Sequence, residues 1–486
     1  MARYRTLNND TEINVDGVRL RAGVDGVFDV VAGSRAEQVL LAGGALPVDG
    51  SGLSSDELGG LRSLVSGAGK SADVGWLPLL QNSSESAAPV AGSSYVAFVR
   101  APCDDFCAVK VVDVMTGNST QAGTVRRYAL GVAADDTAYD AGQPGGSALF
   151  QTAAANTQDG LVGVTFSGSG SVTPTGGAPY APTLTGSDWC TLQSVPASDG
   201  GNPWIAVAMT FSGSGSTTFP YVSLTSDGST STRDAWAAAC LPGGRLTLRA
   251  KSGMDVVANP GSFTSTVAAS GLPLFGLVFR TLSGGRTLLI PGDSIVKGTG
   301  SDIYGNYSGG AVSKGISGWA NKLPRVVEAR NTGVVNLGVG GAKASQYAAL
   351  MKTAYAVFGA SDVIYPPGTP NAETAGKYIA GMRAQAALLT DTIAWVRTNG
   401  LRLHITTPTP FSTEGSEAGS NSAFVAWVAK LRAMSSAGFS VIDFNAALST
   451  GNAYTWASGT VADATTHPSQ AGYDLMLAAA VARITA

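Results

Sequence analysis

The chain has 486 residues, a length that favours two or three domains over one. Only 13% of the residues are charged and the net charge is −3 without a basic cluster, so the composition does not favour nucleic acid or an anionic membrane as a partner. The first residues lack the apolar stretch of a secretion signal, and no stretch reaches the length of a membrane span, so we expect neither signal-directed secretion nor membrane insertion.

Short apolar groups alternate with Gly and Asp through about the first fifty residues, a pattern typical of small hairpins. A Ser- and Ala-rich stretch at 82–94 then has the composition of a linker. We therefore assign residues 1–90 to an N-terminal docking or linker segment.

Residues 95–283 have the pattern of a β domain, because strand-like apolar runs alternate with Gly, Ser and Asp turns. The motif Phe-Ser-Gly-Ser-Gly-Ser occurs at 166–171 and again at 211–216, which indicates two equivalent corners in a jelly-roll-like β-sandwich. Trp189, Trp204 and Trp236 could form a sugar-binding surface, but a tryptophan in such a domain is more often part of the core.

Four cysteines are too few for a disulfide scaffold in a chain of this size. Cys103 and Cys107 have a spacing loosely similar to that of a metal-ligand pair, but both histidines lie in a distant segment. Buried thiols are the better interpretation, so the sequence predicts no metal site here.

Strands and helices alternate over residues 285–486, which predicts a three-layer α/β domain with a parallel five-stranded sheet covered on both faces. The clearest helix has apolar residues at intervals of three and four from Ile379 to Val396 and ends at Gly400. The expected strands lie at 288–291, 334–338, 362–365, 401–406 and 440–444.

A candidate nucleophile follows the first of these strands, where an apolar run stops at Gly292-Asp293-Ser294. The carboxyl ends of parallel strands are where open α/β sheets bind ligands. A serine hydroxyl needs a positioned base, and the chain has only two histidines. His404 lies in the middle of an apolar strand and is expected to be a hydrogen-bonded core residue, which leaves His467 as the base.

Residues 285–486 resemble the SGNH (GDSL-type) hydrolases, which include esterases, lipases and carbohydrate deacetylases. The resemblance implies that Ser294 is the nucleophile, and that its N–H, the N–H of Gly341 and the amide of Asn371 form the oxyanion hole. It also implies that Asp463 orients His467, and that no metal or cofactor takes part. Asp293 is expected to brace the strand end rather than to react.

Two blocks depart from the pattern of that family. The third reads Gly368-Thr369-Pro370-Asn371, with proline where the family usually has asparagine, and the aspartate and histidine are separated by one residue more than usual. A bulge between Asp463 and His467 would restore their contact. Without it, a backbone carbonyl would orient His467 and leave a dyad.

The order of segments resembles that of a bacteriophage tail or baseplate protein. This implies a virion location, other tail proteins and an acetylated O-antigen or capsule polysaccharide as partners, and a role as a carbohydrate O-acetylesterase. A homo-oligomer is compatible with this role, although no coiled-coil heptads indicate one. Two alternatives stay open: a catalytically impaired adhesive tail protein, and a free bacterial carbohydrate acetylesterase.

Overall fold

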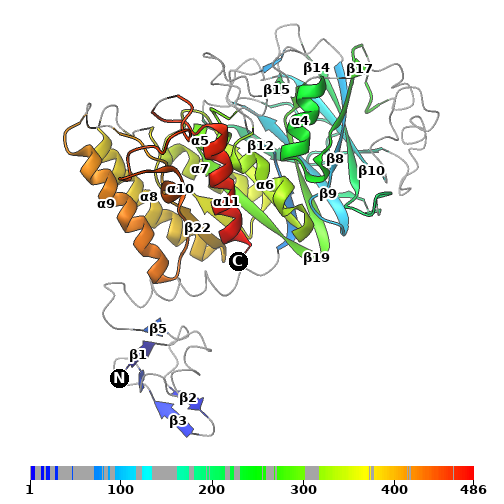
Figure 1. Cartoon of the computed structure of the whole chain (residues 1–486). Helices are drawn as coiled ribbons and strands as arrows, with labels where there is room; N and C mark the ends of the chain where they lie inside the picture. The colour runs from blue at the N-terminus through cyan, green and yellow to red at the C-terminus, as the bar shows by residue number, and fades with distance from the viewer. Residues whose placement is uncertain are drawn as a thin grey trace.

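The computed structural model describes most of the chain from residue 71 onward and short strands before it. In full, it describes residues 2–5, 12–15, 18–21, 28–30, 46–47, 71–78, 80, 86–87, 93–116, 123–133, 161–174, 180–192, 194–195, 197–213, 219–223, 230–253, 255–258, 267–268, 271–301, 317–371, 373, 377–412, 414, 417–463 and 465–485. The predicted order of a β-rich N-terminal region followed by an α/β region is confirmed (Figure 1).

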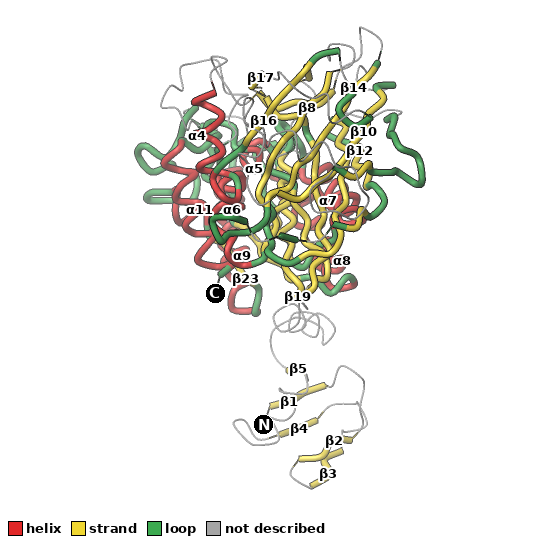
Figure 2. The backbone as a smooth tube through the Cα atoms, turned by 90° about the vertical axis from the view of Figure 1, so that its right-hand side faces the viewer, coloured by secondary structure: helices red, strands yellow, loops and turns green. Residues whose placement is uncertain are grey.

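The N-terminal segment contains short antiparallel strands that lie apart from the rest of the chain in both views (Figures 1 and 2). One sheet has the order β4-β1-β5, and β2 pairs with β3. Their bounds are β1 Ala2–Arg5, β2 Glu12–Val15, β3 Val18–Arg21, β4 Phe28–Val30 and β5 Leu46–Pro47. The hairpin β2-β3 agrees with the predicted hairpins, whereas the docking role of residues 1–90 stays a prediction.

The β-rich region contains a fully antiparallel sheet with the order β11-β10-β14-β8-β16-β17. A smaller sheet has the order β18-β15-β7, and one helix, α4, precedes β16. The bounds are β7 Ser86–Ala87, β8 Ser93–Arg100, β10 Val125–Ala133, β11 Val162–Gly163, β14 Trp204–Ser212, β15 Phe219–Ser223, α4 Thr230–Cys240, β16 Thr247–Lys251, β17 Val267–Ala268 and β18 Gly271–Pro273.

The second large sheet is mixed and joins the β-rich region to the α/β region. Along it lie β12-β9-β19-β21-β22-β23, while β13 pairs with β9, and β20 and β6 pair with β19. The bounds are β6 Ser71–Trp76, β9 Phe106–Met115, β12 Thr183–Gly186, β13 Cys190–Thr191, β19 Phe275–Gly292, β20 Thr332–Gly338, β21 Asp362–Tyr365, β22 Arg402–Thr406 and β23 Ser440–Ile442.

Strand β19 belongs to both halves of this sheet. Its first half pairs antiparallel with β9 and β6, whereas its second half pairs in parallel with β20 and β21. Strands β22 and β23 continue the parallel part. The α/β sheet is therefore continuous with the β-rich region rather than separate, and the expected boundary between residues 283 and 285 falls inside β19. The jelly-roll description of residues 95–283 stays a prediction.

Helices cover the parallel part on both faces. Alternate side chains of its strands point to opposite sides, and because both sets are apolar, each face is buried under helices. Leu289 and Val335 pack in a core with α7, α8 and α9, while Leu288 and Val334 pack with α6, α10 and α11 on the other face. The bounds are α5 Ser294–Lys297, α6 Trp319–Val327, α7 Ala344–Phe358, α8 Tyr378–Thr398, α9 Ser420–Ala433, α10 Phe444–Leu448 and α11 Gln470–Ile484.

The β-rich region packs directly against the α/β region. Phe358 at the end of α7 lies so close to β19 that a Cβ at Gly276 would be 2.6 Å from its ring. On the other side, the backbone N–H of Gly243 donates to Glu328 Oε2 at 2.6 Å, next to the end of α6. The two regions therefore share one apolar core and are joined by more than a linker.

The three tryptophans expected either in a sugar-binding surface or in the core are mostly buried or in contact with basic side chains. Trp236 and Trp204 are 0% and 2% exposed, so they belong to the core. Trp189 is half-buried, and Lys110 Nζ and Arg280 Cζ lie 4.5 and 4.0 Å from its ring centre. Of the repeated motif, the first copy forms a tight turn in which Phe166 and Ser169 exchange hydrogen bonds, whereas much of the second lies outside the described residues.

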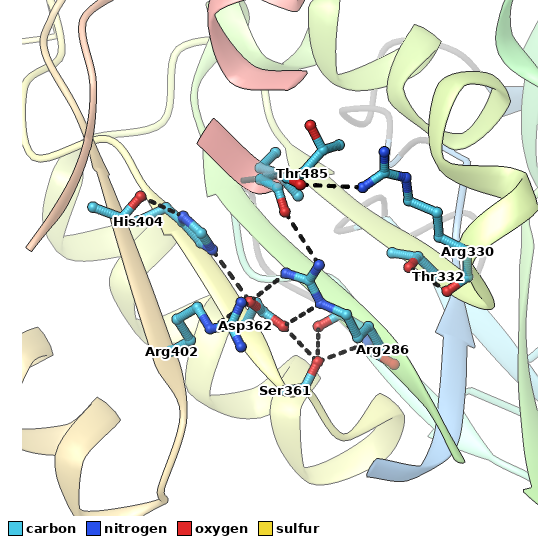
Figure 3. A network of polar contacts seen from close by, with 11 residues as sticks. Arg286, Arg330, Thr332, Ser361, Asp362, Arg402, His404 and Thr485 are labelled. Atoms are coloured by element: carbon cyan, nitrogen blue, oxygen red, sulfur yellow. Dashed lines mark hydrogen bonds and ion pairs between the residues drawn. The ribbon is translucent and has the colours of Figure 1, made fainter. Parts of the chain in front are cut away.

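A buried charge cluster holds the strands together at the edge of the sheet where the parallel strands begin (Figure 3). The Asp362 carboxylate, 0% exposed, accepts hydrogen bonds from Arg286 Nη2 at 2.7 Å and His404 Nε2 at 3.2 Å. His404 Nδ1 lies 2.8 Å from Ser440 Oγ, and Arg286 also donates to the carbonyl oxygen of Ile484. The prediction that His404 is a hydrogen-bonded core residue is confirmed.

The pKa of Asp362 reflects this cluster. Burial alone would raise it, but the hydrogen bonds from His404 and Arg286 and the Arg286 charge hold the pKa well below its ordinary range. A depressed carboxyl pKa contributes stability that is present above the pKa of the unfolded chain and is lost as the pH falls through the folded value.

We therefore expect Asp362→Asn to destabilise the protein strongly, because it leaves the Arg286 charge without its buried partner. Breaking such a pair typically costs about 3–5 kcal/mol. Urea unfolding at pH 7 measures this loss. Below about pH 4, where an unfolded aspartate takes up its proton, the wild type should lose stability more steeply than the variant. Parallel pH profiles for the two proteins would contradict this account.

Candidate active site

Ser294 lies where β19 ends and the short helix α5 begins. Asp293 caps this helix, because its side chain accepts a hydrogen bond from the Ile295 backbone N–H at 2.8 Å. The turn requires close backbone packing, since a Cβ on Gly338 of the neighbouring strand would lie 2.2 Å from the Lys297 nitrogen. Ser294 is 8% exposed, so its hydroxyl lies slightly below the surface.

His467 and Asp463 are carried by one short loop before α11. The loop is closed by an antiparallel bridge between Val461 and Pro468, and the Ala462 N–H donates to the His467 carbonyl oxygen at 2.8 Å. Within it, Asp463 Oδ1 accepts the backbone N–H groups of Thr466 and His467, both at 2.8 Å. The additional residue in this block is therefore accommodated in a turn that the aspartate itself stabilises.

The structure brings Ser294, His467 and Asp463 together. His467 Nε2 lies 2.9 Å from Ser294 Oγ, and His467 Nδ1 is hydrogen-bonded to Asp463 Oδ2. Since a carboxylate can only accept, Nδ1 carries the ring proton and Nε2 is left to accept from the serine. Of the two alternatives considered for His467, the contact with Asp463 is the one observed.

The Asp463 carboxylate is held in its charged form. Partial burial raises its pKa, but the hydrogen bonds from the N–H groups of His467 and Thr466 and from the His467 ring lower it by more. The net pKa therefore lies below the ordinary value. A charged Asp463 can both fix the imidazole tautomer and stabilise a protonated ring.

Asn371 lies against the turn that contains Gly341. Gly341 has φ +78°, in the region that favours glycine, and lies in the turn between β20 and α7. The Asn371 side chain donates from Nδ2 to the carbonyl oxygen of Ala342 at 3.0 Å. The amide group of Asn371 is thus anchored to the turn that contains Gly341, although proline precedes it.

Thr369 was not singled out from the sequence but connects Asp293 to the backbone of Asn371. Its hydroxyl donates to Asp293 Oδ2 and accepts the Asn371 backbone N–H at 3.2 Å. Burial raises the pKa of Asp293, and the hydrogen bonds from Thr369 and the Ile295 N–H offset only part of this rise. Asp293 is thus tied into the strand end, which agrees with its expected bracing role.

Over the described ranges, no three His, Cys, Asp or Glu side chains are grouped so that they could hold a metal ion. Cys103, Cys190 and Cys240 are buried and are not in disulfides, and Cys107 is half-buried.

None of the helices in the described part of the chain has the length and apolar character needed to cross a membrane.

The fold and this arrangement of serine, histidine and aspartate define a hydrolase-type α/β domain. Residues 291–475 match the sequence model of the GDSL-like Lipase/Acylhydrolase family. The C-terminal region of the chain therefore matches the GDSL-type domain that the sequence resemblance indicated. The match covers this region alone and leaves the β-rich region unassigned. No curated protein matches the chain.

Similar solved structures each cover about two fifths of the chain. A GDSL-like lipase from Bacteroides thetaiotaomicron is 13% identical, with a TM-score of 0.31, over 41% of this chain and 88% of that protein. An acetylxylan esterase from Geobacillus stearothermophilus is 18% identical, with a TM-score of 0.30, over 41% of this chain and 94% of that enzyme.

We expect Thr369→Val to lower both stability and esterase activity, while Thr369→Ser retains most of each. Valine has nearly the same shape but leaves Asp293 Oδ2 and the Asn371 N–H without their partner. An unpaired buried polar group costs about 1–3 kcal/mol. Thermal unfolding and the hydrolysis of p-nitrophenyl acetate measure the two effects. Equal behaviour of the valine and serine variants would show that the hydroxyl is dispensable.

Proposed function

We propose that the chain is a serine esterase that removes acyl groups, acetyl above all, from a carbohydrate. The observation that carries this proposal is the contact between Ser294 Oγ and His467 Nε2 at 2.9 Å, with the opposite ring nitrogen hydrogen-bonded to Asp463. A serine paired with an oriented imidazole at the carboxyl edge of a parallel sheet has the geometry of nucleophilic acyl transfer.

In the first half of the reaction, Ser294 Oγ attacks the ester carbonyl carbon while its proton passes to His467 Nε2. The tetrahedral intermediate collapses when the carbon–oxygen bond to the alcohol breaks, and His467 returns the proton to the departing alcohol. A water molecule then attacks the acyl-serine, with His467 again taking and returning one proton. The products are the free alcohol and a carboxylic acid, and Ser294 is restored.

Three groups are the proposed donors to the negative oxygen of the intermediate: the Ser294 N–H, the Gly341 N–H and the Asn371 amide. Neither the Ser294 N–H nor the Gly341 N–H is hydrogen-bonded to any residue that the structure describes. Asn371 uses one of its two amide hydrogens on Ala342, which leaves the second. In comparable sites each such donor lowers the barrier by about 2.7–4 kcal/mol.

The proposed substrate is an O-acetylated surface polysaccharide, and the proposed setting is a phage tail or baseplate. The order of segments supports this idea: short N-terminal strands, then a large β-rich region, then the GDSL-type domain. In that setting the N-terminal segment would dock to other tail proteins, and the distal domain would act on O-antigen or capsule. Both parts rest on architecture alone, so they are tested separately from the chemistry.

Ser294→Ala is expected to abolish hydrolysis of p-nitrophenyl acetate, with a fall in kcat of at least about 10³-fold, because no other group replaces the nucleophile. Ser436→Ala is the matched control, since Ser436 is exposed just before β23, at the opposite edge of the sheet. Activity that survives in Ser294→Ala would contradict the assigned nucleophile. An inactive wild type would favour the impaired, adhesive protein.

If the protein belongs to a phage tail or baseplate, we expect to find it in purified phage particles. We also expect it to release acetate from the polysaccharide of the host. Acetate release and mass spectrometry of virions measure the two. Release without the protein in particles would favour a free carbohydrate acetylesterase. Protein in particles without release would contradict the enzymatic role in the virion.

A further inference from the structure

Tyr180 belongs to the β-rich region in the sequence but lies beside the active site. A Cβ placed on Gly341 would be 3.2 Å from the Tyr180 hydroxyl oxygen and 3.5 Å from its Cε1 atom. The phenol ring therefore packs on the turn whose N–H is proposed to bind the oxyanion. Tyr180 is nevertheless 36% exposed, so the residue is accessible to solvent at this position.

Strand β12 explains how the β-rich region brings a side chain to this place. The strand pairs with β9 at the edge of the mixed sheet, and a Cβ on Gly186 at its end would lie 3.4 Å from Val357 near the end of α7. Six extended residues span about 20 Å, the same length as the helical turns from Ala344 to Val357. The segment from 180 to 186 therefore runs antiparallel along α7, with Tyr180 at the active-site end.

The backbone at this contact is unusual on both sides. Tyr180 has φ +64° and Gly341 has φ +78°. Glycine adopts this conformation without strain, but a bulky residue rarely does, and such strained residues concentrate at functional sites. Close packing of the ring on Gly341 thus coincides with a strained backbone at Tyr180, where a glycine would have been easier to accommodate.

We propose that Tyr180 is a specificity-determining residue that binds the sugar portion of the ester substrate. This inference rests on the proposed function. Ser294 is only 8% exposed and can receive the small acyl carbonyl, whereas the bulky sugar must stay outside, where Tyr180 is exposed. A phenol ring combines an apolar face, which suits the C–H face of a sugar, with a hydroxyl that can donate a hydrogen bond to an oxygen atom of an acetylated sugar.

The hydroxyl group of Tyr180 is the group proposed to contact the sugar. It has no hydrogen bond to any residue in the described part of the chain. Binding sites commonly lie where two structural regions meet, with a few placed polar groups among apolar ones. The β-rich region therefore contributes directly to the recognition surface of the GDSL-type domain.

The test compares two acetate esters that differ only in their alcohol portion. Glucose pentaacetate carries a sugar, whereas p-nitrophenyl acetate does not. We expect Tyr180→Ala to lower kcat/KM for glucose pentaacetate by about 10-fold or more and to change that for p-nitrophenyl acetate by less than about twofold. Tyr180→Phe, which keeps the ring, should show a smaller loss. Leu282→Ala is the control, because Leu282 is 74% exposed in the distant half of β19.

Other outcomes overturn the proposal. An equal loss on both esters would assign Tyr180 to positioning the Gly341 turn, and no loss on either would remove it from the site. Should Tyr180→Ala fold poorly, Tyr180→Gly removes the same ring without backbone strain. Should the wild type hydrolyse neither ester, the proposed function fails. The role of Tyr180 is then tested by binding, with the affinity for glucose pentaacetate measured in Ser294→Ala and in the double variant Ser294→Ala/Tyr180→Ala. Equal affinities would refute the sugar contact.

Discussion

Strand β19 is the constraint on which the rest of the structure depends. One unbroken run, Phe275–Gly292, is antiparallel to its neighbours at one end and parallel to them at the other. It therefore fixes the β-rich region against the α/β region and ends at Ser294. Because the pairing on each half of β19 follows a defined register, with a shift after Arg280 on the antiparallel half, the β-rich region has a defined position relative to the nucleophile.

This shared strand gives the β-rich region a role in the site. A domain on a flexible linker could supply avidity but not a side chain at a fixed place beside a catalytic turn. Here β9, bound to β19, carries β12 along α7, and α7 begins just after Gly341. The position of Tyr180 follows from this chain of paired elements.

Local patterns predicted the α/β part of the fold well, because apolar periodicity and glycine caps act over a few residues. The strand at Asp362–Tyr365 and the helix around Ile379–Val396 were found where they were expected. The shared sheet could not be predicted, since the pairing of β19 with β6 and β9 joins segments far apart in sequence. A run that contains Ser283, Gly284 and Gly285 reads as a turn rather than as a strand interior.

The site, like the fold, has residues that local sequence predicted and residues that only contacts distant in sequence bring into place. Ser294 and His467 were singled out by motif and scarcity, and Asp463 by its place before the histidine. Thr369 was missed because its partners are Asp293 and the Asn371 backbone, which meet it only in the folded chain. Tyr180 gave no signal either, since a tyrosine after Gly-Gly-Ala-Pro in a β-rich region is unremarkable by composition.

The loop that carries Asp463 and His467 has a mechanical consequence. The same carboxylate holds the imidazole ring and the backbone that bears it, so acid and base form a single rigid piece. If the loop shifts, the contact between Asp463 and His467 can be kept while the gap between Nε2 and the serine oxygen changes. The proposed activity therefore depends on the distance between Ser294 Oγ, after the end of β19, and His467 Nε2, in the loop before α11.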